Sequence, residues 1–248
     1  MKFLKIILLL LILIATTNAN TIYNLIKIPN LEIYENKSSN GLKYLMATKP
    51  FQVGIRDNNV TCFNSNIEDI DEKFEIIQRN LNKYSSNFLE KINLKYIVLC
   101  EKLSVSGISS AGVPNHEMKT LIIDIKFDNN YFDRVIHHEV FHIINESFKN
   151  YFQENDWKKY NNTQFKYAEC STCSDRLDLS TIKETDGFLT EYSMSTASED
   201  MAEIFSFLMT KKNSIKIKNL KDIILINKIS FIKKKILKID DKFKFNLW

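Results

Sequence analysis

Hydrophobic residues recur at helical spacing in four stretches of the chain, residues 67–92, 131–149, 199–210 and 220–237. Apolar positions three or four residues apart lie on one face of a helix, so each stretch predicts an amphipathic or buried helix. Asn130 precedes the second stretch as an expected N-cap, and Ser198 precedes the third. The pattern therefore predicts four helices, of which the first is long.

Shorter apolar runs predict strands between these helices. Residues 94–100 form a continuous apolar run, which is typical of a buried strand, and residues 23–33 and 42–46 are further candidates. Residues 121–127 alternate between apolar and polar side chains, which predicts a half-buried strand directly before the second helix. Residues 103–119 contain Ser, Gly and Pro and are expected to form a loop.

The second predicted helix is apolar around most of its circumference, so we expect it to be buried. It nevertheless carries His138, Glu139 and His142, which form an H-E-x-x-H motif. The two histidines lie one turn apart on one face and can bind one zinc ion, with Glu139 beside the position of a water. Asn145 follows on the same face and could contact a metal-binding side chain. A hydrogen-bonded histidine pair without metal is the alternative.

A catalytic zinc site needs a third protein ligand. The chain lacks the Gly and His that extend the motif in metzincins. His137 lies about 140° round the helix from His142 and cannot share the metal, and His116 in a loop is a weak candidate. Glu199 and Glu203 lie one turn apart on the third helix: one can bind zinc, and the other can accept a hydrogen bond from a zinc-binding imidazole. Acidic residues at a helix start are also common without metal.

The segment from Gly187 to Glu203 reads G-F-L-T-E-Y-S-M-S-T-A-S-E-D-M-A-E. It resembles the block G-F-[VL]-[ST]-x-Y-A-x-[ST]-x-x-x-E-D-x-A-E of the putative zinc-binding metallopeptidases, a family related to the lethal-factor-type catalytic domain of the gluzincins. The H-H-E-V-F-H-I-I stretch around the motif is similar to the active-site helix of that family. The resemblance covers residues 121–148 and 187–209, and Ser193 stands where the family usually has Ala.

The resemblance implies that Glu199 is the third zinc ligand, that the Tyr192 hydroxyl stabilises the oxyanion, and that Glu203 supports a ligand. It also implies an α+β, zincin-like fold with one zinc ion per chain. We expect a mixed sheet and the active-site helix in an N-terminal lobe, about residues 20–149. A mainly helical C-terminal lobe, residues 150–248, completes a single domain over residues 20–248, with a long loop containing short helices in its first part.

Residues 1–19 have the organisation of a cleaved signal peptide. Lys2 and Lys5 precede a short apolar run, and Thr17 to Ala19 form a small-residue cleavage site. The run is too short to span a bilayer comfortably, although an uncleaved anchor is the alternative. We therefore expect a secreted protein without stable membrane insertion.

The four cysteines favour disulfides, because secreted chains fold in an oxidising compartment. We expect a local Cys170–Cys173 bridge and a Cys62–Cys100 bridge. A zinc ion held by all four cysteines, or four buried thiols, are the alternatives.

Charge adds little to this picture. The formal net charge is +4, and removal of Lys2 and Lys5 would leave about +2, so nucleic acid is not an implied partner. Residues 210–248 hold twelve Lys and three Asp. A basic helix there could touch an anionic membrane, but a solvated face is the better interpretation.

Together the motifs predict a secreted zinc-dependent peptidase, most simply an endopeptidase, whose partner is a peptide or protein substrate. Residues 121–127 would be the edge strand along which an extended peptide pairs. A catalytically inactive zincin-fold binding protein and a metal-free structural domain are the alternatives. The sequence does not indicate an oligomeric state.

Overall fold

The computed structural model describes residues 27–35, 37–54, 59–182, 184–210 and 221–245. The predicted signal peptide, residues 1–19, lies outside them. Within the described part, no helix is both long and apolar enough to cross a membrane.

The chain divides into two compact units, each built from two segments. The first unit comprises residues 1–74 and 95–127, and the second comprises residues 75–94 and 128–248. The H-E-x-x-H helix thus belongs to the same unit as the C-terminal helices. The α+β class is confirmed, whereas a zincin-like arrangement of lobes stays a prediction.

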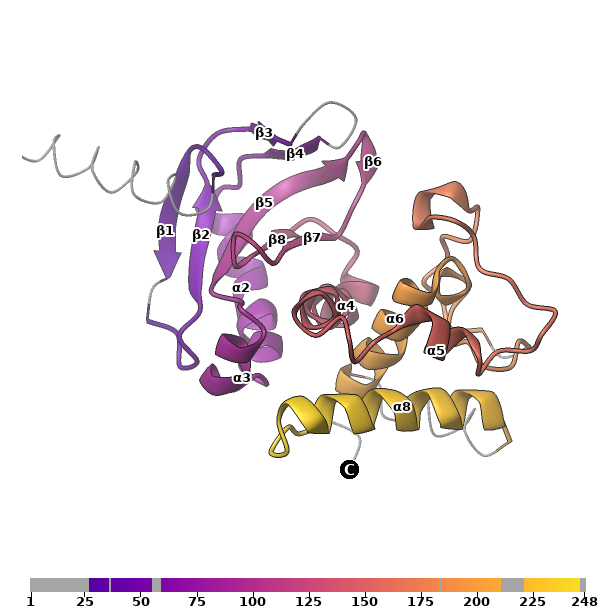
Figure 1. Cartoon of the computed structure of the whole chain (residues 1–248). Helices are drawn as coiled ribbons and strands as arrows, with labels where there is room; N and C mark the ends of the chain where they lie inside the picture. Colours follow the sequence, from indigo (N-terminus) through magenta and orange to yellow (C-terminus); the bar gives the residue numbers. More distant parts are fainter. Residues whose placement is uncertain (1–26, 36, 55–58, 183, 211–220, 246–248) are drawn as a thin grey trace, which may run out of the picture. The chain divides into compact units, whose positions relative to one another are not determined.

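A mixed sheet forms the first unit, and its strands are coloured indigo to magenta in Figure 1. β1 (Leu31–Glu35) pairs antiparallel with β2 (Lys43–Ala47), which pairs parallel with β5 (Tyr96–Val105). β8 (Thr120–Asp124) pairs parallel with β5 and antiparallel with β7 (Gly112–Asn115). β5 is therefore the central strand of this part of the sheet.

The long β5 also carries a second set of antiparallel strands. β4 (Val60–Phe63) pairs with β5 and β3 (Phe51–Val53), and β6 (Ile108–Ser109) pairs with the end of β5. The predicted disulfide between Cys62 and Cys100 is present and joins β4 to β5. β5 therefore joins both sets of strands into one sheet.

Two predictions for residues 103–127 were wrong. The expected loop at residues 103–119 contains the end of β5, β6 and β7, because the turn at Ser106 and Gly107 forms a hairpin that its short strands did not signal. β8 is buried along all five residues and lies between β5 and β7, so it is neither half-buried nor an edge. Its polar Asp124 is buried because it accepts backbone hydrogen bonds from Lys102 and Leu103, both 3.1 Å long.

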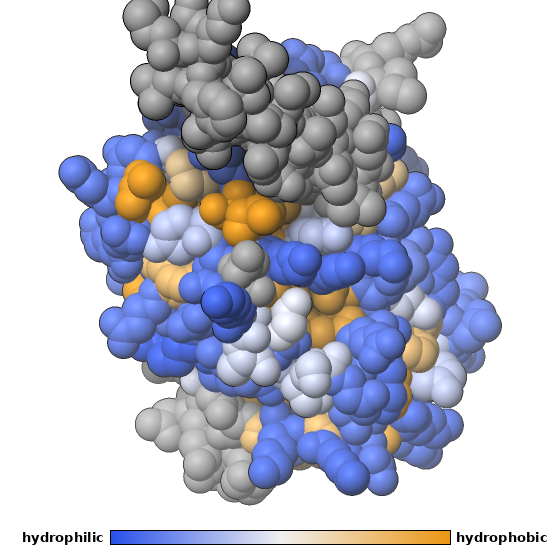
Figure 2. Space-filling model, turned by 90° about the vertical axis from the view of Figure 1, so that its left-hand side faces the viewer, coloured by the Kyte–Doolittle hydropathy of each residue, from blue (hydrophilic) through white to orange (hydrophobic). Residues whose placement is uncertain are grey.

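The core of this unit follows from the two-residue period of its strands. Tyr96, Val98 and Cys100 alternate along β5 and pack with Leu45 of β2 and Ile122 of β8. On the face shown in Figure 2, hydrophilic side chains predominate outside the grey atoms, and hydrophobic ones form separate patches. Burial of the apolar face is the main stabilising contribution expected for such a sheet.

The long helix predicted over residues 67–92 is two helices, α2 (Ile67–Leu81) and α3 (Ser86–Lys91). The break occurs because the Ser85 side chain accepts a hydrogen bond from the Phe88 backbone and starts α3 as its N-cap. α2 contributes residues to both units, since the division falls after Phe74.

The second unit is mainly helical. Its longest helix, α4 (Asn129–Ser147), packs against α6 (Ala197–Thr210), which also contacts α5 (Glu154–Lys158) and α8 (Ile223–Ile239). The 3-10 turns η1 (Ser171–Cys173) and η2 (Tyr192–Met194) lie in the connection between α5 and α6. The expected Cys170–Cys173 disulfide is present at η1.

Two predicted helix caps were each two residues out of place. Asp128, not Asn130, caps α4, because its carboxylate accepts from the Asn130 backbone. Thr196, not Ser198, accepts from the Glu199 backbone at the start of α6. Because Thr196 caps α6, the Ser198 hydroxyl is available to contact His142 in the site described below.

A buried ion pair anchors α8 to α6. Nζ of Lys228 lies 2.6 Å from Oδ2 of Asp200, and both side chains have no exposed surface. The same oxygen accepts hydrogen bonds from Trp157 and Tyr167, at 2.8 and 2.6 Å. The lysine-rich helix therefore has a buried charge that its solvated-face interpretation did not predict.

Candidate metal centre

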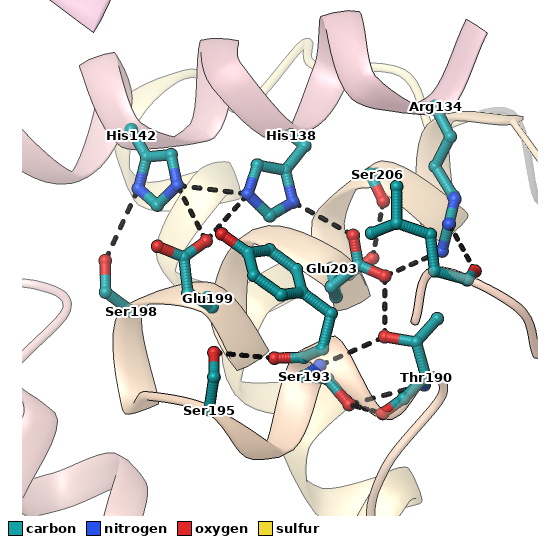
Figure 3. Close-up of polar contacts among 12 residues, drawn as sticks. Arg134, His138, His142, Thr190, Ser193, Ser195, Ser198, Glu199, Glu203 and Ser206 are labelled. Atoms are coloured by element: carbon teal, nitrogen blue, oxygen red, sulfur yellow. Dashed lines mark hydrogen bonds and ion pairs between the residues drawn. The ribbon is translucent and has the colours of Figure 1, made fainter. Parts of the chain in front are cut away.

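Three side chains from α4 and α6 converge on one point (Figure 3). Nε2 of His138 and Nε2 of His142 lie 3.1 Å apart, one turn apart on α4. Oε2 of Glu199 lies 2.8 Å from the first nitrogen and 3.2 Å from the second. The helix period brings the histidines together, and the packing of α6 on α4 adds the carboxylate.

This triangle has the dimensions of one face of a zinc tetrahedron. Zinc bonds of 2.0–2.1 Å in tetrahedral geometry place neighbouring ligand atoms about 3.3 Å apart. The three observed separations of 3.1, 2.8 and 3.2 Å all lie below that value, by no more than about 0.5 Å. Within the part of the chain that the structure describes, no other group of His, Cys, Asp or Glu is suitably placed for a metal. The donors therefore fit zinc with a fourth position left for water or substrate.

The second nitrogen of each imidazole also has a partner, which sets the orientation of the ring. Nδ1 of His138 lies 2.9 Å from Oε1 of Glu203. Nδ1 of His142 lies 3.4 Å from Oγ of Ser198. A proton on Nδ1 leaves Nε2 as the lone-pair nitrogen toward the metal position, which is the tautomer that a metal ligand requires.

The electrostatics of the site favour a cation. Burial lowers the pKa of His138, but its hydrogen bonds to Glu199 and Glu203 outweigh this effect and raise the pKa to about 10. Burial opposes ionisation of Glu199, yet the neighbouring imidazoles hold its pKa well below the ordinary value. Two buried carboxylates thus attract positive charge to this point, as zinc binding requires.

Glu139 and Tyr192 lie beside the triangle. Burial, opposed by the two imidazoles, raises the pKa of Glu139 to about 7. Among the described residues, none is hydrogen-bonded to the Glu139 carboxylate. The Tyr192 ring lies 5.8 Å from that of His138, between centroids. Burial and the charges of Glu199 and Glu139 raise the pKa of Tyr192, so its hydroxyl stays protonated and can donate.

Two residues that the sequence reasoning missed surround Glu203. Arg134 Nη1 donates to Oε2 of Glu203 over 2.6 Å, and Thr190 Oγ1 donates to the same oxygen over 2.8 Å. Arg134 lies one turn before His138 on a largely apolar helix, and that position was a usable signal. Thr190 offered no such signal, because a single threonine in a connecting segment is common.

Two further sequence expectations concern neighbours of the motif. His137 faces away from the triangle, as expected, and is buried against Tyr84, Asn80 and Lys83, with 2.5 Å from its Nδ1 to the Tyr84 hydroxyl. Asn145 is half-buried on α4. None of the hydrogen bonds found within the described part of the site involves Asn145, so its supporting role stays a prediction.

Comparisons with known proteins assign the chain to a family. The sequence profile described as "Putative zinc-binding metallo-peptidase" matches residues 109–244, more than half of the chain. A crystal structure of a putative zinc-binding metallo-peptidase from Bacteroides caccae ATCC 43185 has a similar fold, with a TM-score of 0.50 and 19% identity. That match covers 78% of this chain and 77% of the other. No curated protein matches. The chain belongs to the putative zinc-binding metallo-peptidase family.

Proposed function

We propose that this protein is a secreted zinc-dependent endopeptidase that hydrolyses peptide bonds with Glu139 as general base. The observation that carries the proposal is the triangle of His138, His142 and Glu199, which fits zinc, with Glu139 unpaired beside it among the described residues. A site built only for structural zinc would close the fourth position with another protein ligand.

When bound, zinc supplies Lewis-acid chemistry that polarises a carbonyl oxygen and lowers the pKa of water toward ~7. The oxygen of the attacking water bonds to the carbonyl carbon and the C–N bond breaks. Glu139 accepts one proton of that water and passes it to the departing nitrogen, so that the products are a carboxylic acid and an amine. His138, His142 and Glu199 hold the ion, and Glu203 and Ser198 keep the two imidazoles in their ligand orientation.

Tyr192 is proposed to stabilise the developing oxyanion. Its hydroxyl stays protonated because burial and nearby carboxylates raise its pKa, so it can donate a hydrogen bond as negative charge forms on the carbonyl oxygen. The seven-residue spacing from Tyr192 to Glu199 is the spacing found in lethal-factor-type sites. This supports a gluzincin mechanism for the chain.

Two observations support secretion. Residues 1–19 have the organisation of a signal peptide. All four cysteines are paired in two disulfides, Cys62–Cys100 and Cys170–Cys173, and such pairing is typical of oxidising compartments. Peptides or proteins outside the cell are therefore the proposed substrates.

The test combines metal content with hydrolysis. Purified protein lacking residues 1–19 is loaded with zinc, dialysed and assayed by elemental analysis and with a library of internally quenched peptides. We expect one zinc per chain, and a sharp loss of zinc in Glu199→Ala. Glu139→Gln should retain zinc and lose hydrolysis. Glu146→Gln, an exposed glutamate on the same helix, is the matched control and should retain both.

Each outcome has a clear meaning. Zinc-free wild-type protein after supplementation would overturn the metal site. Hydrolysis retained in Glu139→Gln would overturn the general-base assignment. Zinc bound by the three ligands without hydrolysis of any library peptide would instead favour a catalytically inactive, zincin-fold binding protein.

A further inference from the structure

We infer that Arg134 is a positioning residue for zinc: it holds Glu203 so that one carboxylate oxygen faces His138, and thereby sets the affinity of the site. This inference rests on the zinc site proposed above. Arg134 touches neither the metal position nor the reacting atoms, so its effect must pass through Glu203 and His138.

The two oxygens of Glu203 have separate partners. Oε2 accepts from Arg134 Nη1 at 2.6 Å and from Thr190 Oγ1 at 2.8 Å. Oε1 is left facing Nδ1 of His138, at 2.9 Å. The carboxylate is planar, so fixing Oε2 by two donors also fixes the direction of Oε1. His138 is therefore oriented by a group that is itself held from the opposite side.

Arg134 is held independently of Glu203. Its Nη2 donates to the backbone carbonyl of Leu179 at 2.6 Å, and its guanidinium carbon lies 4.5 Å from the centre of the Phe207 ring. The arginine and glutamate side chains are each only 2% exposed. A buried, doubly anchored guanidinium gives one fixed hydrogen-bond direction, which a solvated lysine could not give.

Charge balance explains why the positively charged Arg134 is buried beside Glu203. Glu199, Glu203 and Glu139 place three carboxyl groups in and around the metal position. A divalent ion balances two negative charges, and the Arg134 guanidinium lies against the one carboxylate that is not proposed to touch metal or water. Removing this arginine leaves Glu203 with a neutral donor at Oε2 and an uncompensated charge in a buried position.

The experiment measures zinc affinity by competition with a chromogenic chelator, and the visible spectrum of the cobalt-substituted protein. Arg134→Met should weaken zinc binding by about 10- to 100-fold, the range found when partners of ligating histidines are removed. Its cobalt spectrum should change, because His138 loses its fixed orientation. Arg134→Lys should recover part of the affinity, since a cation near Oε2 is restored.

Thr190→Val keeps the experiment informative if Arg134→Met fails to fold. It removes one hydrogen bond at Oε2 with little change of shape, so we expect a smaller affinity loss and a spectral change in the same direction. Ile232→Ala, a fully buried residue of α8, is the control for general destabilisation: it should lower the melting temperature and leave zinc affinity unchanged.

Unchanged zinc affinity and cobalt spectra in Arg134→Met and Thr190→Val would overturn the inference and leave Arg134 a structural residue. Loss of affinity in Ile232→Ala equal to that in Arg134→Met would overturn it as well. Failure of wild-type protein to bind zinc would instead overturn the proposed function, so the two failures are distinguishable.

Discussion

Lys228 and Asp200 form an ion pair of 2.6 Å in which neither side chain has exposed surface. Asp200 directly follows the proposed ligand Glu199, and Lys228 also donates to the carbonyl of Gly187 over 2.9 Å. The pair thus ties α8 both to α6 and to the segment that leads to Thr190 and Tyr192. Burial makes each charge dependent on the other, because water cannot replace a missing partner.

Replacing Lys228 by Met should destabilise the zinc-free protein by about 3–5 kcal/mol, the cost of leaving a buried carboxylate unpaired. The double variant Lys228→Met with Asp200→Asn should be less destabilised than the single one, because no buried charge remains. Urea denaturation followed by circular dichroism measures both. Lys158→Met, which removes an exposed pair with Glu154, should cost no more than about 1 kcal/mol. A similar cost at both lysines would contradict this account.

Gly187→Ala should destabilise the protein through a steric clash. Gly187 has φ of +84°, and a Cβ there would lie 2.5 Å from Cγ2 of Ile224. Gly41 has the same φ of +84° with nothing within 4 Å, so Gly41→Ala carries the backbone penalty alone. We expect Gly187→Ala to lower the melting temperature more than Gly41→Ala does. The clash should reduce the free energy of unfolding by an additional amount of about 1–3 kcal/mol.

The double variant Gly187→Ala with Ile224→Ala tests the cause of that loss. Ile224→Ala removes the clashing methyl group, so the second substitution should cost less in the Gly187→Ala background than in wild-type protein. Additive costs would show that the clash is not the source of the difference.

Tyr192→Phe should retain zinc and lower kcat by about 100- to 1,000-fold, as expected for loss of one oxyanion donor. The ring stays in place beside His138, so only the hydroxyl is tested. Steady-state hydrolysis of a peptide found in the library, with zinc content measured in parallel, gives the result. Tyr131→Phe removes a peripheral hydroxyl that contacts Ser180 and should leave kcat unchanged. Unchanged kcat in Tyr192→Phe would show that the Tyr192 hydroxyl does not stabilise the oxyanion.

The two disulfides should contribute unequally to stability. Cys62 and Cys100 are 38 residues apart, whereas Cys170 and Cys173 are 3 apart. Loop-closure entropy gives about 4 kcal/mol for the first and about 1.6 kcal/mol for the second. Paired Cys→Ala variants, compared by their urea midpoints, should therefore differ in that order. The reverse order would mean that folded-state contacts outweigh chain entropy at one of the bridges.

The two histidines of the candidate metal site were predictable because they are local in sequence, only four residues apart. His138 and His142 lie on one face by the helix period alone, whatever α4 packs against. Glu199 was among two carboxylates left open by spacing, and the family resemblance selected it. The resemblance also implied that Glu203 supports a ligand. Both disulfides were predicted as well, since four cysteines offer few pairings.

The prediction that residues 121–127 form an edge strand was wrong for a physical reason. Alternation along residues 121–127 indicates two unlike faces, but the hydrogen-bonding neighbours of a strand leave no mark in its own pattern. β7, which pairs with β8, is a short strand whose sequence, Gly-Val-Pro-Asn, is typical of a loop. The single helix predicted over residues 67–92 was wrong because a cap at Ser85 competes locally with helix continuation.

Periodic and local patterns in the sequence predict the buried helix α4, the spacing of its two histidines, and the acidic start of α6. The partners of these side chains follow only from the folded structure. Arg134 meets Glu203 across 69 residues of chain, and Lys228 meets Asp200 across 28. Such pairs depend on how helices pack, and burial then makes them indispensable, because in a dry interior each charge needs a partner that only the folded chain supplies.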